Sequence, residues 1–242
     1  MSTVITRSTG TGNDSRRISL IAGLLFLATF VTSIPAAILY DPILGDAGFI
    51  LGVGSEARVT VGAVLELLLI AANIGTALVL YPVLRRQSEV AALGWVSARI
   101  IESVFIAVGL IALLAMVTLR QESTADAAVL SAIGDSLVAI HDWTFRIGPG
   151  LVVGIGNGLL LGYLMFKSGL VPRGMSVLGL VGGPLLFVSG VLVVLGGIDQ
   201  GSLAKAVMAI PEILWEASLT LYLIFKGFRP SPVLEQGEEG SA

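Results

Sequence analysis

The chain contains no cysteine among its 242 residues, and only 13% of them are charged. The missing cysteine excludes disulfides, thiolate metal sites and cysteine nucleophiles. Soluble domains carry about 25% charged residues, so this chain has too little polar surface to face water on all sides. The formal net charge of −3 and the lack of any basic cluster argue against a nucleic-acid partner.

Catalytic motifs are also scarce. His141 is the one histidine, so a multi-histidine metal site cannot be built, and we predict no cofactor or metal. An intramembrane serine hydrolase would need a serine beside His141. Ser189 is the nearest candidate, but it lacks a surrounding G-x-S-x-G turn. No lysine falls in the middle of an apolar run, which excludes a Schiff-base chromophore. The sequence therefore favours a binding protein over an enzyme.

Apolar sequence is what the chain has in abundance: 55% of its residues are hydrophobic, and its mean hydropathy is +0.94. A helix needs about 20 apolar residues to cross a hydrocarbon core about 30 Å thick. Only helices and closed barrels satisfy their backbone hydrogen bonds there. We therefore predict an all-α, polytopic membrane protein with a bundle of six transmembrane helices, at 18–40, 58–84, 91–119, 136–166, 173–197 and 204–226. The last helix could begin at Ala204 or at Pro211.

The two ends of the chain are polar. We expect residues 1–15 and 228–242 to be disordered tails, the second of them acidic, on either side of one membrane domain at 16–227. Nine lysines and arginines lie in the N-terminal, second, fourth and C-terminal flanks of the six runs, and three lie in the other flanks. The positive-inside rule therefore predicts that both termini are cytoplasmic.

Ionisable and amide side chains inside the apolar runs are the most informative residues. A charge in hydrocarbon costs at least a few kcal/mol, so such residues usually face a bundle interior or a wet cavity. At about 1.5 Å per residue, those of the second, third, fourth and sixth runs lie at overlapping depths. We therefore predict one polar site between these four helices, formed by Glu66, Asn73, Arg99, Glu102, His141, Asp142, Arg146, Asn157, Glu212 and Glu216.

The charges of this site do not balance, because five acids stand against two arginines. Some of the carboxyls should therefore carry protons, or a bound cation should supply the missing charge. Glu212 and Glu216 are the best candidates to share protons, since nothing basic lies near them in sequence. We expect Arg146 to contact an acid of another helix, Glu66 or Glu102 first. Arg99 could instead extend to the inner headgroups.

Two functions remain open at this point. The site could bind or translocate a small polar or cationic species, with protons as partners. Alternatively, this is a structural or signalling membrane protein whose buried charges only fix the packing of the helices. A water-filled cavity at Glu66 and Asp142 would favour the first function, and a dry, fully paired network would favour the second.

Glycines repeat every four residues along the fourth run, a pattern that lets helices approach closely. We expect this stripe to pack within the chain, against Gly179 and Gly183 of the fifth run, or else to form a homodimer; its members are Gly150, Gly154, Gly158 and Gly162. The sequences Gly148-Pro149-Gly150 and Gly182-Gly183-Pro184 predict kinks in the fourth and fifth helices.

Several of these stretches together resemble one family. The longest are His141-Asp142 with Arg146-Ile147-Gly148, the run 158–164, and Lys167-Ser168-Gly169-Leu170-Val171-Pro172-Arg173. Shorter ones are Arg16-Arg17 with Ile21-Ala22-Gly23, Arg99-Ile100-Ile101-Glu102, and Pro211-Glu212 through Lys226-Gly227. Together they resemble a bacterial membrane family known as domain of unknown function 4386. The resemblance implies a six-helix protein of the bacterial cytoplasmic membrane, with the lipid bilayer as its surroundings and no assigned activity.

Overall fold

The computed structural model describes residues 11–45 and 47–239, and this part of the chain contains helices but no strand. Six of its helices are long and apolar enough to cross a membrane, which confirms the predicted all-α bundle of six spans. The first three are α1 (Thr11–Leu44), α2 (Glu56–Leu84) and α3 (Glu89–Glu122). The fourth runs from Ala127 to Ser168 through α4 (Ala127–Ile147), η2 (Gly148–Val152), η3 (Gly154–Leu161) and α5 (Gly162–Ser168). The last two are α6 (Arg173–Val194) and α7 (Leu203–Phe225). A short helix η1 (Ala47–Leu51) lies between α1 and α2, and another, α8 (Pro232–Glu239), follows α7.

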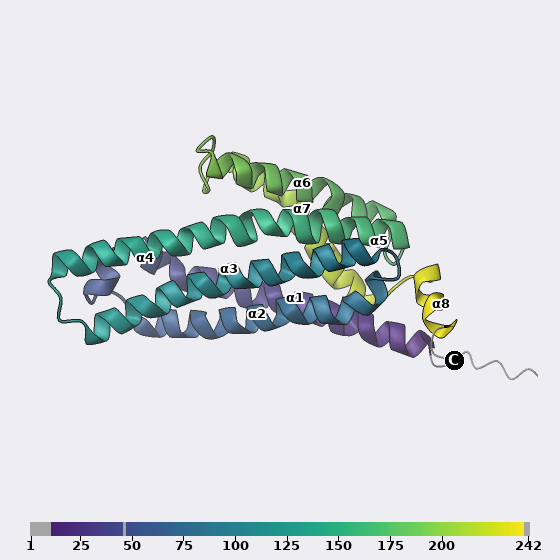
Figure 1. Cartoon of the computed structure of the whole chain (residues 1–242), viewed down its shortest axis with the longest axis horizontal. Helices are drawn as coiled ribbons and strands as arrows, with labels where there is room; N and C mark the ends of the chain where they lie inside the picture. Colours follow the sequence, from purple (N-terminus) through teal and green to yellow (C-terminus); the bar gives the residue numbers. More distant parts are fainter. Residues whose placement is uncertain (1–10, 46, 240–242) are drawn as a thin grey trace, which may run out of the picture.

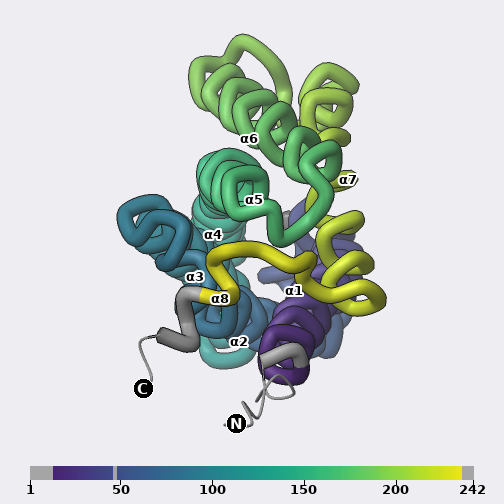
Figure 2. The backbone as a smooth tube through the Cα atoms, turned by 90° about the vertical axis from the view of Figure 1, so that its right-hand side faces the viewer, coloured from purple at the N-terminus to yellow at the C-terminus, as the bar shows by residue number. Residues whose placement is uncertain are grey.

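The spans form a long four-helix bundle with a shorter hairpin beside it. Helices α1 to α4 run along one another, and the α6–α7 hairpin packs beside the part of the bundle nearest α5 and α8 (Figure 1). Helix α6 packs on α7 and η3, while α7 packs on α1 (Figure 2). The helices of the hairpin have 22 and 23 residues, so each is about 33 Å long, close to the thickness of a hydrocarbon core. The bundle extends beyond the hairpin at the η1 end (Figure 1).

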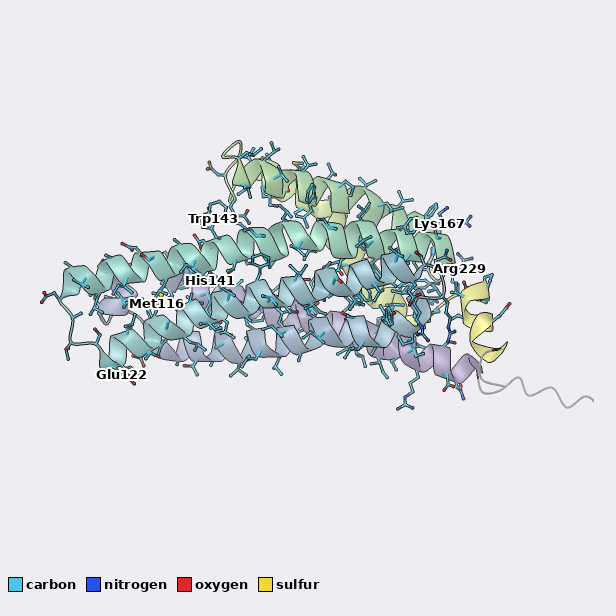
Figure 3. The ribbon with its side chains drawn as sticks, viewed as in Figure 1. Met116, Glu122, His141, Trp143, Lys167 and Arg229 are labelled. Atoms are coloured by element: carbon cyan, nitrogen blue, oxygen red, sulfur yellow. The ribbon has the colours of Figure 1, made fainter. Side chains whose placement is uncertain are left out.

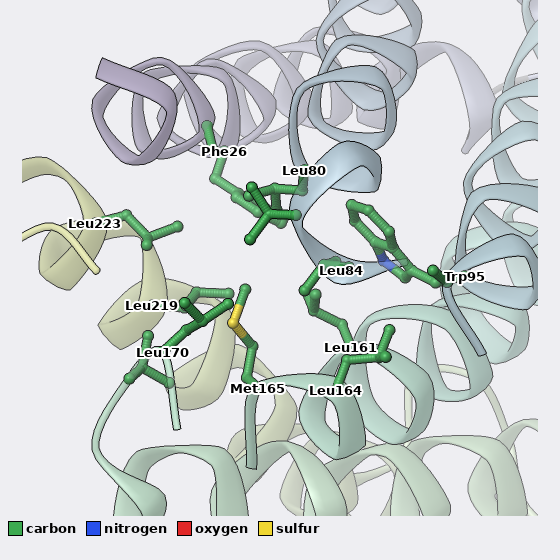
Figure 4. Packing of buried hydrophobic residues seen from close by; sticks show 14 of the residues in the cluster. Phe26, Leu80, Leu84, Trp95, Leu161, Leu164, Met165, Leu170, Leu219 and Leu223 are labelled. Carbon is green, nitrogen blue, oxygen red and sulfur yellow. The ribbon is translucent and has the colours of Figure 1, made fainter. Parts of the chain in front are cut away.

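Apolar side chains form a buried cluster at the α5 and α8 end of the bundle. Its largest members include Trp95, Phe26 and Met165, which come from three different spans (Figure 4), and Trp215 of a fourth span. A second cluster around Tyr40, Phe49 and Met116 lies at the η1 end. The polar side chains described below lie between these clusters or beside them.

Helix α7 begins at Leu203, one residue from the predicted start at Ala204, so the alternative start at Pro211 is wrong. The Ser202 hydroxyl accepts a hydrogen bond of 3.2 Å from the backbone N–H of Lys205, which is an N-cap interaction. Pro211 therefore lies inside the helix. Pro184 likewise lies inside α6, which stays α-helical from Arg173 to Val194.

The predicted tails are shorter than expected. Residues 11–15 belong to helix α1, and Arg16 ties the first turns of this helix to the end of α7 by donating to the carbonyls of Leu223 (3.1 Å) and Ile224 (2.6 Å). Within 228–242, α8 is helical, and the carbonyl of its buried Val233 accepts a hydrogen bond of 3.1 Å from Arg86. Residues 1–10 and 240–242 of these predictions lie outside the described residues. The start of α1 and α8 lie at the same end of the bundle (Figure 1).

The glycine stripe is buried within the chain against α6. A Cβ atom on Gly154 would lie 2.6 Å from the carbonyl oxygen of Gly183, and one on Gly158 would lie 2.3 Å from its Cα. The stripe thus packs within the chain, against Gly183 and its neighbours on α6. The predicted kink at Gly148-Pro149-Gly150 takes the form of a change from α- to π-helical hydrogen bonding in η2 and η3.

Candidate functional site

Arg99 forms a closed polar group with two neighbours on α2 and α3. Its Nη1 lies 2.7 Å from Oε2 of Glu102, and its Nη2 donates to Oδ1 of Asn73. The Asn73 amide in turn donates to Oε1 of Glu102 at 3.2 Å. The three residues are 2%, 6% and 1% exposed, in the order Arg99, Glu102, Asn73. Arg99 therefore does not extend to the headgroups, because its guanidinium has partners inside the bundle.

Asn157 of η3 joins three helices through its side chain and backbone. Its Oδ1 accepts from the indole of Trp95 (3.0 Å), and its Nδ2 donates to Oε1 of Glu216 (2.6 Å). Its backbone carbonyl accepts from the indole of Trp215 at 2.9 Å. Glu216 is partly buried and also interacts electrostatically with Arg99 and Glu102. The π-helical segment thus holds an amide between α3 and α7.

Glu212 lies one turn before Glu216 on α7 and has no donor. It is 2% exposed, and neither of its carboxyl oxygens has a hydrogen-bond partner. A Cβ atom on Gly158 would lie 2.5 Å from its Oε2, and one on Gly182 would lie 2.5 Å from its backbone nitrogen. The carboxyl thus lies against Gly158 of η3, and the backbone of Glu212 lies against Gly182 of α6. An unpaired buried charge costs several kcal/mol, so this group needs either a proton or a cation.

A second polar cluster, separate in its contacts, joins α1, α2 and α4. The Tyr40 hydroxyl donates to Oε2 of Glu66 at 3.2 Å, and the Tyr40 ring meets His141 edge-on, with 5.7 Å between ring centroids. Only glycine fits at position 62, since a Cβ there would lie 2.3 Å from the Tyr40 ring. The buried Nδ1 of His141 has no hydrogen-bond partner and lies 4.0 Å from Oδ1 of Asp142. Figure 3 shows His141 and Trp143 well away from the end marked by Lys167 and Arg229.

The prediction that Arg146 contacts Glu66 or Glu102 is wrong. Its Nη2 lies 3.6 Å from Oδ2 of Asp142 on the same helix, and its guanidinium lies 5.0 Å from the centroid of the Trp143 ring. Its side chain is 31% exposed. An acid four residues earlier and an aromatic ring three residues earlier satisfy the charge locally, so it has no need of another helix. The predicted residues therefore form two groups of contacts rather than one.

Lys205 is a buried polar residue that the sequence analysis missed, because it was counted among the flanking residues. It is 5% exposed, and its Nζ donates to the carbonyl of Gly150 and to Oγ of Ser189, both at 2.9 Å. Its position seven residues before Glu212, on the same face of α7, was the available signal. Ser189 therefore pairs with Lys205 rather than with His141.

The polar clusters offer no set of metal ligands in the described part of the chain, and the two pockets lie elsewhere. Among the described residues, no group of three or more His, Cys, Asp or Glu side chains could hold a metal ion. A pocket at the η1 end is lined by Pro42, Phe49, Arg58 and their neighbours. A second, on the first turns of α4, is lined by residues between Ala128 and Leu137. Neither pocket includes Glu66 or Asp142.

Comparison with known proteins identifies a family and nothing closer. A family model described as Domain of unknown function (DUF4386) matches residues 21–227, most of the chain, which confirms the predicted resemblance. No curated protein and no solved structure matches the chain. Any functional conclusion therefore depends on the geometry of the polar residues.

Proposed function

The chain belongs to this family, whose description assigns no activity, and we propose from its geometry that it binds or translocates a small cation, the proton first, at Glu212 and Glu216. The site lies within a multi-pass protein, which we assign to the bacterial cytoplasmic membrane. The Lys and Arg bias makes the end of the bundle that carries α8 the cytoplasmic one.

One observation carries this proposal: the two carboxyl oxygens of Glu212 are buried and have no hydrogen-bond donor. Every polar group that is deprived of water needs a partner, and a charged one needs it most. A proton on the carboxyl, or a cation beside it, removes the cost. Intramembrane acids in this situation are typical of proton and ion pathways.

The surroundings of Glu212 support the exchange of a proton or cation at its carboxyl rather than a permanent contact with another side chain. Glu216, one turn away, is partly buried and accepts a hydrogen bond from Asn157. The facing helix is π-helical over Gly154–Leu161, an irregularity often found at functional sites. Arg99 interacts electrostatically with Glu216 but is already paired with Glu102, so the acids of α7 have no full counter-charge of their own.

The test is infrared difference spectroscopy of the purified protein in lipid. The wild type should show the C=O stretch of a protonated carboxyl, or a carboxylate band that shifts on addition of Na⁺. Glu212→Gln should abolish that signal. Glu66→Gln is the matched control, because Glu66 already has Tyr40 as a donor, and it should keep the signal. A wild-type spectrum with neither feature would refute the proposal.

Flux measurements then separate binding from translocation. Liposomes that contain the protein and a pH-sensitive dye should show proton flux that Glu212→Gln lowers and Glu66→Gln leaves unchanged. Equal flux in wild type and Glu212→Gln would limit the function to binding.

The second candidate function is structural, and one observation favours it: Arg99 pairs with Glu102 inside the bundle, and both hydrogen-bond to Asn73. A buried network of this kind can fix the register of the helices. If packing were the whole purpose of these buried charges, addition of Na⁺ would shift no carboxylate band of the wild type, and Glu212→Gln would leave the flux at the wild-type level.

A further inference from the structure

Lys205 is buried at the end of the α6–α7 hairpin without an acidic partner. Among the described residues no ion pair involves its ammonium group, and its two acceptors are the carbonyl of Gly150 and the hydroxyl of Ser189. The side-chain amide of Gln200 lies at the same place. A Cβ atom on Gly150 would lie 3.9 Å from Nε2 of Gln200 and 4.0 Å from Nζ of Lys205. The buried Oε1 of Gln200 has no hydrogen-bond partner.

The hydrogen-bond directions argue against a serine nucleophile here. The Ser189 hydroxyl donates its proton to the carbonyl of Leu186 at 2.8 Å, so it can only accept from Lys205. A general base would have to accept that proton instead. Ser189 is also fully buried, and a Cβ on Gly190 would lie 2.8 Å from the carbonyl oxygen of Gly150. No substrate could reach the hydroxyl.

The same atoms are a set of oxygen ligands for a cation. A carbonyl from an irregular part of a membrane helix and a hydroxyl are hard oxygen ligands that suit a small monovalent ion. We propose that the Gly150 carbonyl and the Ser189 hydroxyl form a cation site whose resident is the protein's own Lys205 ammonium, with the Gln200 amide beside it. The tethered ammonium holds α6 and α7 to the π-helical segment η2, so the hairpin needs no free metal ion at this end.

This site is distinct from Glu212, and the inference does not depend on the proposed function. It makes a specific prediction: with the lysine removed, a free cation should take its place. Lys205→Ala leaves the ligands and opens room for Na⁺ or methylammonium. Lys205→Met keeps the aliphatic stem, so it removes the charge without opening that room.

The experiment measures the detergent melting temperature of each variant in NaCl, methylammonium chloride and choline chloride at equal ionic strength. Lys205→Ala should melt below the wild type in choline chloride, and one of the two small cations should recover at least half of the loss. The wild type should have the same melting temperature in all three salts. Lys205→Met should also have one melting temperature in all three salts, and it should lie below that of the wild type. Adding Ser189→Ala to Lys205→Ala should abolish the recovery.

A response of Lys205→Ala that is the same in all three salts would overturn the proposal, as would a Lys205→Met variant that melts with the wild type. If Lys205→Ala does not fold, Ser189→Ala alone provides the test, because it keeps the lysine and removes one ligand. It should melt below the wild type, and an unchanged melting temperature would refute the site.

Discussion

The Arg99–Glu102 pair offers the sharpest test of the energetics of this bundle. Arg99→Met removes the ion pair of 2.7 Å and the hydrogen bond to Asn73, and it leaves Glu102 with the Asn73 amide as its donor. Glu102 is 6% exposed, so water does not replace the lost partner. Breaking a buried pair from one side costs about 3–5 kcal/mol.

That loss translates into a large change in melting temperature. For a chain of this size, 1 kcal/mol shifts the midpoint by about 2–4 °C, so Arg99→Met should lower it by roughly 6–20 °C. Removing both charges is the decisive variant. Arg99→Met with Glu102→Leu leaves no unpaired charge, and such replacements are often neutral or stabilising. The double variant should therefore melt above Arg99→Met.

A matched control exists on α4. The Asp142–Arg146 pair is longer, at 3.6 Å, and its side chains are 41% and 31% exposed. Exposed pairs contribute about 0.2–1 kcal/mol, so Arg146→Met should shift the midpoint by no more than about 4 °C. Thermal unfolding in detergent, followed by intrinsic tryptophan fluorescence, measures all three variants. Equal losses of melting temperature for Arg99→Met and Arg146→Met would refute the reasoning. A double variant whose loss is the sum of the losses of Arg99→Met and Glu102→Leu would refute it as well.

Three further predictions follow from the packing and the topology. Gly158→Ala should destabilise the protein, because its Cβ would lie 2.3 Å from the backbone of α6. Gly174→Ala should be neutral, since nothing lies within 4 Å of its Cβ position, and thermal melts compare the two variants. Arg120→Ala should speed hydrogen exchange in the segment 47–55, because its guanidinium donates to four carbonyls there, and unchanged exchange would contradict this function. In the cysteine-free chain, Gln87→Cys should react with an impermeant maleimide only from the cytoplasmic side and Thr124→Cys only from the outside, and labelling of both from one side would contradict the topology.

The sequence alone was enough to establish the class of the protein and the number of its spans. Span length and apolar content depend on local composition, and the bilayer imposes helices on every long apolar run. The Arg99–Glu102 pair is local in the same sense, because two residues three positions apart on one helix lie close enough to pair whatever the neighbouring helices are. The family resemblance likewise depended on local motifs, and the family match confirms it.

Partners on different helices were beyond the reach of the sequence. Counting residues gives depth along a helix, but it does not give the rotation of that helix about its axis or its neighbours. Arg146 was therefore assigned to another helix, although Asp142 and Trp143 of its own helix satisfy it. Lys205 was treated as a flanking residue until the packing of α6 and η2 buried it. The donor-free carboxyl of Glu212 is likewise a property of the tertiary structure, because the packing of α7 against η3 buries it beside Gly158, which has no side chain to donate a hydrogen bond.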